Sequence, residues 1–191
     1  MFPEMWYSWV LWGIHIVSAL LVSRIFPVST TSTKIENPYA CGITEAMASA
    51  VKAMTFVCGW ITIFRILITF LNRWVLWALP VTAQVAIAGL LELSNGCCIL
   101  GLIDSIPVRF TLCACFLALG GLCVTMQTAS AAKGISLRYY IVGKCLQTVF
   151  SILLSLSIWH PWLILPLFSG YFLLIMGKFR KNSRNPAAIG V

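Results

Sequence analysis

Charged residues are scarce in this chain. They make up 9% of its 191 residues, and only 5 residues are acidic, whereas about 25% of a soluble globular domain is charged. Hydrophobic residues make up 60% of the chain, and the mean hydropathy is +0.95. This composition leaves too little polar surface to cover a water-soluble core. It excludes a soluble enzyme and predicts a membrane protein.

Sequence signals for several other classes of protein are missing as well. Tracts of low hydrophobicity, triplet glycine and charged heptads are absent, which excludes a disordered chain, a collagen and a coiled coil. A basic patch with aromatic partners is absent, so we expect no nucleic-acid partner. The 8 cysteines lack C-x-x-C spacing and His15 is distant from His160, so we expect neither a metal nor another cofactor. The sequence contains no recognisable set of a nucleophile, a base and an orienting group, so we expect no enzymatic activity.

Apolar runs of about 20 residues, the length that spans a bilayer as a helix, recur along the chain. They predict an all-α, polytopic integral membrane helical bundle with about six spans, at residues 6–26, 50–71, 83–103, 108–126, 139–158 and 162–177. Basic residues follow the last span, and such clusters mark the cytoplasmic side. With six spans the amino terminus is also cytoplasmic. If the third segment is re-entrant instead, the count is odd and the amino terminus lies outside.

The same pattern divides the chain into five parts. In order, they are a first transmembrane helix, a polar loop, a main transmembrane domain, a last transmembrane helix and a basic cytoplasmic tail, at residues 1–26, 27–43, 44–158, 159–177 and 178–191. The expected location is therefore a cell membrane that the chain crosses several times. The lipid bilayer is its first partner, and the carboxyl terminus is cytoplasmic.

Glu92 lies near the middle of an apolar run. A charge at that depth costs roughly 2.5–3.5 kcal/mol on insertion scales, so a compensating group is required. Arg65 in the preceding span differs from Glu92 in depth by only about 3 Å, at 1.5 Å per residue. We therefore predict that these two side chains pair. The pair is either a structural clamp between two helices or part of a solute or coupling-ion site.

Polar residues and glycines interrupt two of the apolar runs. Ser94 and Asn95 follow Glu92, and the pair Gly120-Gly121 precedes a second group of hydrogen-bonding side chains, Gln127, Thr128 and Ser130. Irregular backbone persists inside a membrane only where protein or a water-filled cavity surrounds it. We therefore expect broken or re-entrant segments at both places, of the kind that bind solutes in many transporters. The alternative at the second place is an ordinary loop at the membrane surface.

Polar side chains recur at helical spacing along residues 139–158. They include Lys144, Gln147 and Ser151 and form one stripe on the predicted helix. Such a stripe faces protein or water. It either lines a solute path or packs against a neighbouring helix, because small hydroxyl residues are common at helix contacts in membranes.

Two segments resemble a known family. The runs GLLELSNG at 89–96 and FLALGGLCVTMQ at 116–127 resemble the nucleoside-recognition, or Gate, domain. The similarity covers about residues 44–157 and is closest to the second half of the sporulation integral membrane proteins of spore-forming Firmicutes. Gate domains are also similar to segments of concentrative nucleoside transporters. That resemblance implies solute contacts for Glu92, Gln127 and Thr128.

The resemblance, together with Glu92 and the two breaks, gives the leading hypothesis. It is a Gate-family protein of the bacterial inner membrane, acting as a permease or permease subunit for a small polar solute, with nucleosides as one candidate, and linked to sporulation. The alternative is a structural or assembly membrane protein of spore formation that does not transport. Because family members have two such halves and this chain resembles one, we expect a homodimer or a complex with a separately encoded Gate half.

Overall fold

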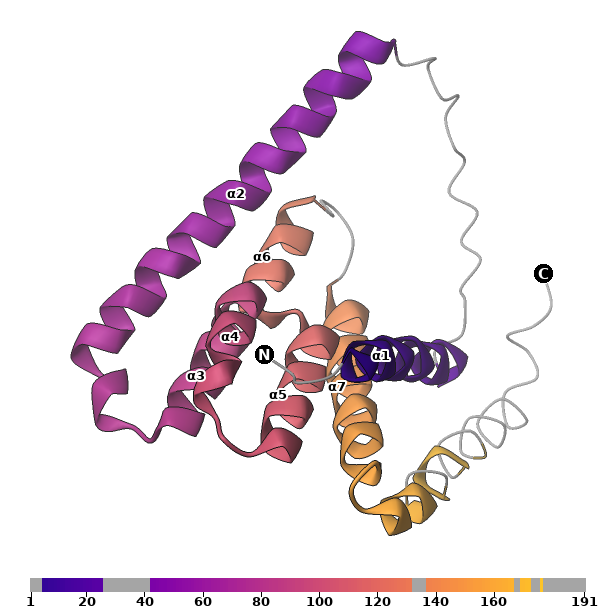
Figure 1. Ribbon diagram of the computed structural model, residues 1–191. Coiled ribbons are helices and arrows are strands. Elements are labelled where there is room, and N and C mark those ends of the chain that lie inside the picture. The colour runs from indigo at the N-terminus through magenta and orange to yellow at the C-terminus, as the bar shows by residue number, and fades with distance from the viewer. Residues whose placement is uncertain (1–4, 26–41, 132–136, 167–168, 173–175, 177–191) are drawn as a thin grey trace, which may run out of the picture. The chain divides into compact units, whose positions relative to one another are not determined.

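The computed structural model describes residues 5–25, 42–131, 137–166, 169–172 and 176 (Figure 1). Within these ranges the secondary structure is helical and contains no strand, which confirms the predicted all-α class. Four helical stretches are long and apolar enough to cross a membrane, at Trp6–Ile25, Ile43–Trp74, Ile106–Ala131 and Arg138–Ser157. They indicate a membrane-spanning protein. The predicted count of about six spans is not confirmed.

The helices group into two compact units. The first contains the helices α1, α5 and α7, with bounds Trp6–Ile25, Ile106–Leu119 and Arg138–Ser157. The second contains α2, α3, α4 and α6, with bounds Ile43–Trp74, Val81–Leu91, Leu93–Ile99 and Gly121–Ala131. Short 3-10 turns are at Leu76–Ala78, Leu100–Leu102 and Pro161–Leu163. The predicted main domain, residues 44–158, therefore contributes helices to both units.

Aromatic and hydroxyl side chains hold the first unit together. Phe110 of α5 is fully buried, and its ring contacts the rings of Tyr7 on α1 and Trp159 after α7. The hydroxyl of Ser151 on α7 donates a hydrogen bond to the hydroxyl of Ser18 on α1, at 2.9 Å. Both serines are buried. The first unit thus adds aromatic and small polar contacts to a core that also contains aliphatic side chains, among them those around Val22 and Phe150.

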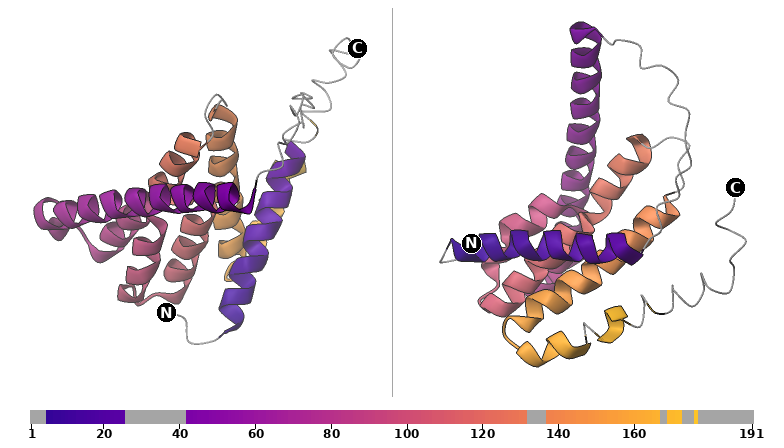
Figure 2. Two further views of the ribbon diagram at one scale, coloured as in Figure 1. Left: turned by 90° about the horizontal axis from the view of Figure 1, so that it is seen from above. Right: turned by 90° about the vertical axis from the view of Figure 1, so that its right-hand side faces the viewer.

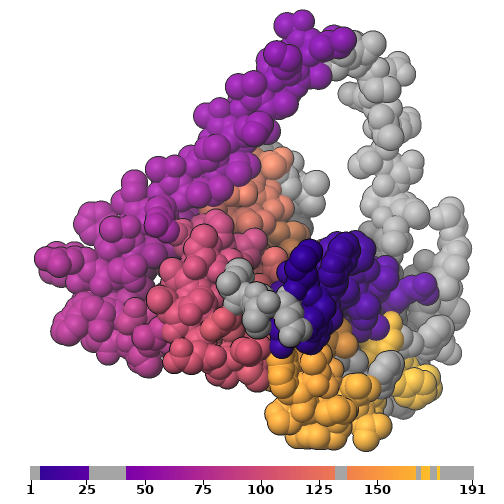
Figure 3. Space-filling model, viewed as in Figure 1, coloured from indigo at the N-terminus to yellow at the C-terminus, as the bar shows by residue number. Residues whose placement is uncertain are grey.

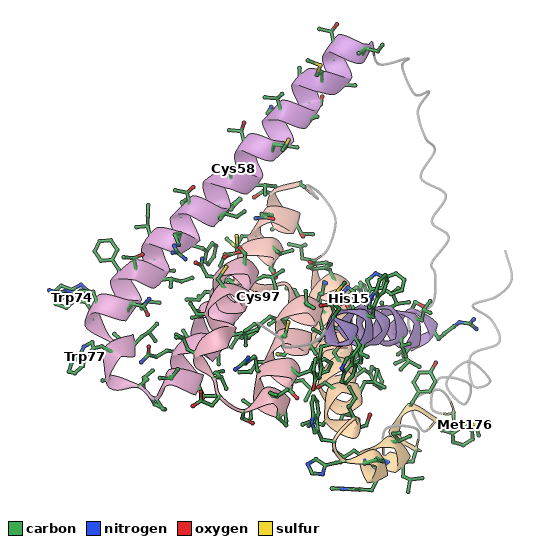
Figure 4. The ribbon with its side chains drawn as sticks, in the orientation of Figure 1. His15, Cys58, Trp74, Trp77, Cys97 and Met176 are labelled. Atoms are coloured by element: carbon green, nitrogen blue, oxygen red, sulfur yellow. The ribbon has the colours of Figure 1, made fainter. Side chains whose placement is uncertain are left out.

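The second unit is built along α2, the longest helix. α2 contacts both α3 and α6, and α3 contacts α4 and α6 (Figures 1 and 2). Only Phe64 and Ile68 of α2 are buried, and most of its other side chains are on the surface (Figure 3). Trp74 at its carboxyl end and Trp77 in the 3-10 turn that follows project away from the helices (Figure 4). Exposed tryptophans at a helix end are typical of the membrane interface.

Two of the six predicted spans are divided in the structure, at the two places where the sequence predicts breaks. The third, 83–103, is divided into α3 and α4, each too short to cross a bilayer. The fourth, 108–126, is divided into α5 and α6. The first, second and fifth correspond to α1, α2 and α7 within a few residues, except that α2 begins seven residues earlier. Of the sixth, residues 167–168, 173–175 and 177 lie outside the described residues, as do the whole predicted tail and most of the predicted polar loop.

Candidate functional site at two helix breaks

Glu92 separates α3 from α4. Its backbone is extended, with φ −145° and ψ 118°, so the helical course stops for one residue and starts again at Leu93. The break lies where the sequence predicts one. The carboxylate is buried, with 4% of the residue exposed. A buried carboxylate needs hydrogen-bond donors around it, because an isolated charge in an apolar medium is strongly unfavourable.

The donors come from the first turn of α4. One carboxylate oxygen accepts hydrogen bonds from the backbone N–H and the hydroxyl of Ser94, at 3.0 and 2.6 Å. The other accepts from the backbone N–H and the side-chain amide of Asn95, at 2.7 and 2.8 Å. Glu92 is therefore the N-cap of α4. Its charge is balanced by four donors and by the positive end of the helix dipole.

The predicted ion pair of Glu92 with Arg65 is not formed. Both residues are described, and no contact within ion-pair distance joins them; Arg65 is exposed on α2. The physical reason is local. The break releases the backbone N–H groups of Ser94 and Asn95 beside the carboxylate. Sequence spacing gives the depth of the two side chains in the membrane, but it does not reveal that these hydrogen-bond donors lie closer to Glu92.

The second break is at the two adjacent glycines. Gly120 and Gly121 have φ values of 77° and 73°, a left-handed conformation that side chains with a Cβ avoid. A Cβ added to Gly121 would lie 3.2–3.3 Å from the carbonyl oxygens of Gly89, Leu90 and Leu91. The start of α6 thus lies directly against the carboxyl end of α3, so the two breaks meet within the second unit.

Gln127 is connected to this region through Cys123. Its side-chain amide donates to the Cys123 sulfur at 3.2 Å, and Cys123 is buried two residues after Gly121 on α6. The hydroxyl of Thr128 donates to the carbonyl of Val124 one turn earlier on α6. Of the predicted solute-binding residues, the structure therefore gathers Glu92, Ser94 and Asn95 at the first break, while Gln127 lies on α6 one turn after Cys123.

Ser130 lies elsewhere. It borders a groove between α2 and α6, next to Lys52 and Thr55, and its hydroxyl donates to the carbonyl of Met126. Along α6 it is nine residues beyond Gly121, which corresponds to about 13 Å. The predicted group of Gln127, Thr128 and Ser130 therefore divides between two places on α6.

The polar stripe of α7 faces other helices of the first unit. Gln147 and Ser151 are buried, and Ser151 bonds to α1. The ammonium of Lys144 donates to the carbonyl of Ala118 at 3.1 Å. That carbonyl belongs to the last turn of α5, where carbonyl groups have no hydrogen-bond donor within the helix. These contacts favour helix packing over a solute path for the stripe.

Two features of these sites escaped the sequence analysis. The contact of Cys123 with Gln127 was not predicted, although a spacing of four residues on a helix is a signal for such a contact. Lys52, beside the α2–α6 groove, was also missed. Its signal is the distance of 21 residues to Arg73, which matches the thickness of a bilayer.

We compared the chain with known protein families, curated proteins and solved structures. No protein family, no curated protein and no solved structure matches this chain.

Proposed function

We propose that this protein is a permease, or a subunit of a permease, for a small polar solute, and that it belongs to the Gate family of the bacterial inner membrane with a role in sporulation. The proposal rests on one observation. A buried carboxylate lies at one helix break, and this break contacts a second break. Helix breaks bring polar backbone and side chains to membrane depth, and transporters use them to bind solutes.

Within this proposal Glu92 positions other groups. Its oxygens already accept four hydrogen bonds, so the solute contacts fall to the side-chain amides of Asn95 and Gln127. The bond from the Asn95 amide nitrogen to Glu92 fixes the orientation of that amide and leaves its oxygen as an acceptor. Two amides present both donors and acceptors, which suits a solute with a mixed hydrogen-bonding edge, such as a nucleobase.

Asparagine in place of Glu92 tests the proposal. Asparagine is a strong N-cap, so Glu92→Asn keeps a cap on α4 while removing the charge. We measure thermal unfolding in mild detergent with a panel of nucleosides, bases, amino acids and dicarboxylates. A bound solute at 100 times its Kd adds about 2.7 kcal/mol of stability. We expect one class of solute to stabilise the wild-type protein and not the folded Glu92→Asn variant.

The matched control is Glu45→Gln, which removes an exposed acid from the first turn of α2. It should respond to the solute as the wild type does. If no solute in the panel stabilises the wild type, the permease proposal fails. The alternative, a structural or assembly protein of spore formation, is favoured by the same four hydrogen bonds, because they satisfy Glu92 without any ligand. The proposed homodimer, or complex with a separate Gate half, applies to either function.

We also propose that α3 and α4 form a re-entrant segment, which gives five spans and an outside amino terminus. The support comes from the direction of α6. This helix starts at the carboxyl end of α3. Near its other end Ser130 lines the same groove as Lys52 and Thr55, which lie in the amino-terminal half of α2 (Figure 1). The start of α2 and the end of α6 then share one membrane side. A full crossing by 83–103 would put them on opposite sides.

Charge distribution agrees with the five-span arrangement. It leaves only Arg73 and Arg109 among the basic residues of the outer segments. Apart from Arg65, which lies within a span, it groups the others with the basic tail on the inner side, among them Arg24, Lys34, Lys133 and Arg138. That is a stronger inside bias than six spans give.

Reporter fusions distinguish the two arrangements. We fuse a reporter that is active only in the cytoplasm after Leu79, and the same reporter after Lys133. Five spans put these points on opposite sides of the membrane, so we expect activity only after Lys133. Six spans put both points inside, and activity in both fusions would refute the re-entrant segment.

A further inference from the structure

A groove of about 430 Å³ runs between α2 and α6 in the second unit. Its lining is mainly apolar, and the two helices border each other in the space-filling view (Figure 3). Its lining includes Lys52, Phe56, Gly59, Trp60 and Ile63 of α2 and Ser130 of α6. A volume of this size falls in the range of ligand-binding clefts in proteins.

Lys52 lies at one end of the groove, near the start of the predicted span 50–71. Residues 53–72 separate it from Arg73, and 20 helical residues measure about 30 Å, the thickness of the hydrocarbon layer. If Lys52 and Arg73 mark the two boundaries, then Phe56, Gly59 and Ile63 extend from Lys52 into the hydrocarbon. The groove therefore has a cationic end at the interface and an apolar body inside the membrane.

Among the residues that the structure describes, no acidic side chain pairs with this cationic end. Among the described residues, Lys52 makes no hydrogen bond or ion pair. The body of the groove is open at Gly59, where an added Cβ would meet nothing within 4 Å. An occupant must accordingly be anionic at one end and apolar along its length. A small polar solute fits the first requirement but not the second.

We propose that this groove binds one anionic phospholipid, with its phosphate at Lys52 and an acyl chain along Phe56, Gly59 and Ile63. The hydroxyl oxygen of Ser130 borders the groove from α6 and can accept a hydrogen bond from the headgroup. In the five-span arrangement Lys52 faces the cytoplasmic leaflet, which attracts basic groups through its anionic lipids. The site is separate from the Glu92 break and does not depend on transport.

Lipid binding to the full-length protein in mild detergent tests the proposal. Native mass spectrometry counts bound phosphatidylglycerol and phosphatidylcholine, and thermal unfolding measures their effects. We expect phosphatidylglycerol to bind more tightly and to stabilise more. Lys52→Gln should weaken that preference about fivefold, the value of one cation near an anionic surface. Gly59→Leu, which fills the groove, should reduce retention of both lipids.

Two control variants isolate these effects. Arg73→Gln removes a cation from the other end of α2 and should keep the preference at Lys52. Gly13→Leu adds the same side chain at another open glycine, on α1, and should leave lipid retention unchanged.

Four outcomes would overturn the proposal. The first is equal binding of the two lipids by the wild type. The second is a preference for phosphatidylglycerol that survives both Lys52→Gln and Gly59→Leu. The third is the same stabilisation by inorganic phosphate alone, which would indicate a site for a free anion. The fourth is a protein dimer that Gly59→Leu dissociates without changing the lipid count, which would indicate a second helix in the groove.

Discussion

Replacement of Gly121 by alanine should lower the free energy of unfolding by about 3 kcal/mol, the sum of two separate penalties. Gly121 has φ 73°, and a left-handed conformation costs a residue with a Cβ roughly 1–2 kcal/mol. The new Cβ would also lie 3.2–3.3 Å from three carbonyl oxygens of α3. These are backbone atoms, so they yield only if α3 moves away from α6. Unfolding in mixed micelles of mild detergent and dodecyl sulfate measures the loss.

Gly101→Ala is the matched control in the same unit. A Cβ at Gly101 would meet nothing within 4 Å, and its φ is not in the left-handed region. An alanine at such a position keeps stability or raises it by up to about 1 kcal/mol. If Gly121→Ala and Gly101→Ala unfold alike, the close contact of α6 with α3 is wrong, and the two breaks do not meet as described.

The second large effect is expected at Glu92. Alanine at this position removes the acceptor of two backbone N–H groups, those of Ser94 and Asn95. Asn95 is buried, so at least one of these donors loses its partner away from water. Loss of an N-cap together with a buried unsatisfied donor costs about 2–3 kcal/mol. The same unfolding titration measures this loss for Glu92→Ala.

Glu92→Asn separates the cap from the charge. Because asparagine caps helices well, it should recover more than half of the stability that Glu92→Ala loses. Equal losses in Glu92→Ala and Glu92→Asn would contradict the capping role, since the charge itself would then hold the fold together. A loss near zero in both variants would show that the break does not depend on this side chain.

The sequence alone determined the class of protein and the places where its helices stop. Composition requires apolar helices, because so few charges cannot cover a soluble fold. The lengths of the apolar runs locate most ends of α1, α2 and α7 to within a few residues. The breaks at Glu92 and Gly120-Gly121 were also predictable. A charged residue beside polar ones, and two adjacent glycines, each weaken a helix for local reasons that the sequence displays.

The tertiary structure alone decided which groups those breaks bring together. Sequence spacing paired Glu92 with Arg65 by depth, but hydrogen bonds act over about 3 Å, and the N–H groups of α4 are closer. Spacing likewise could not show that Ser151 bonds to Ser18, 133 residues away in the sequence, or that Gly121 lies against the end of α3. Such contacts depend on how helices pack, because depth along an axis does not determine which face a helix turns to its neighbour.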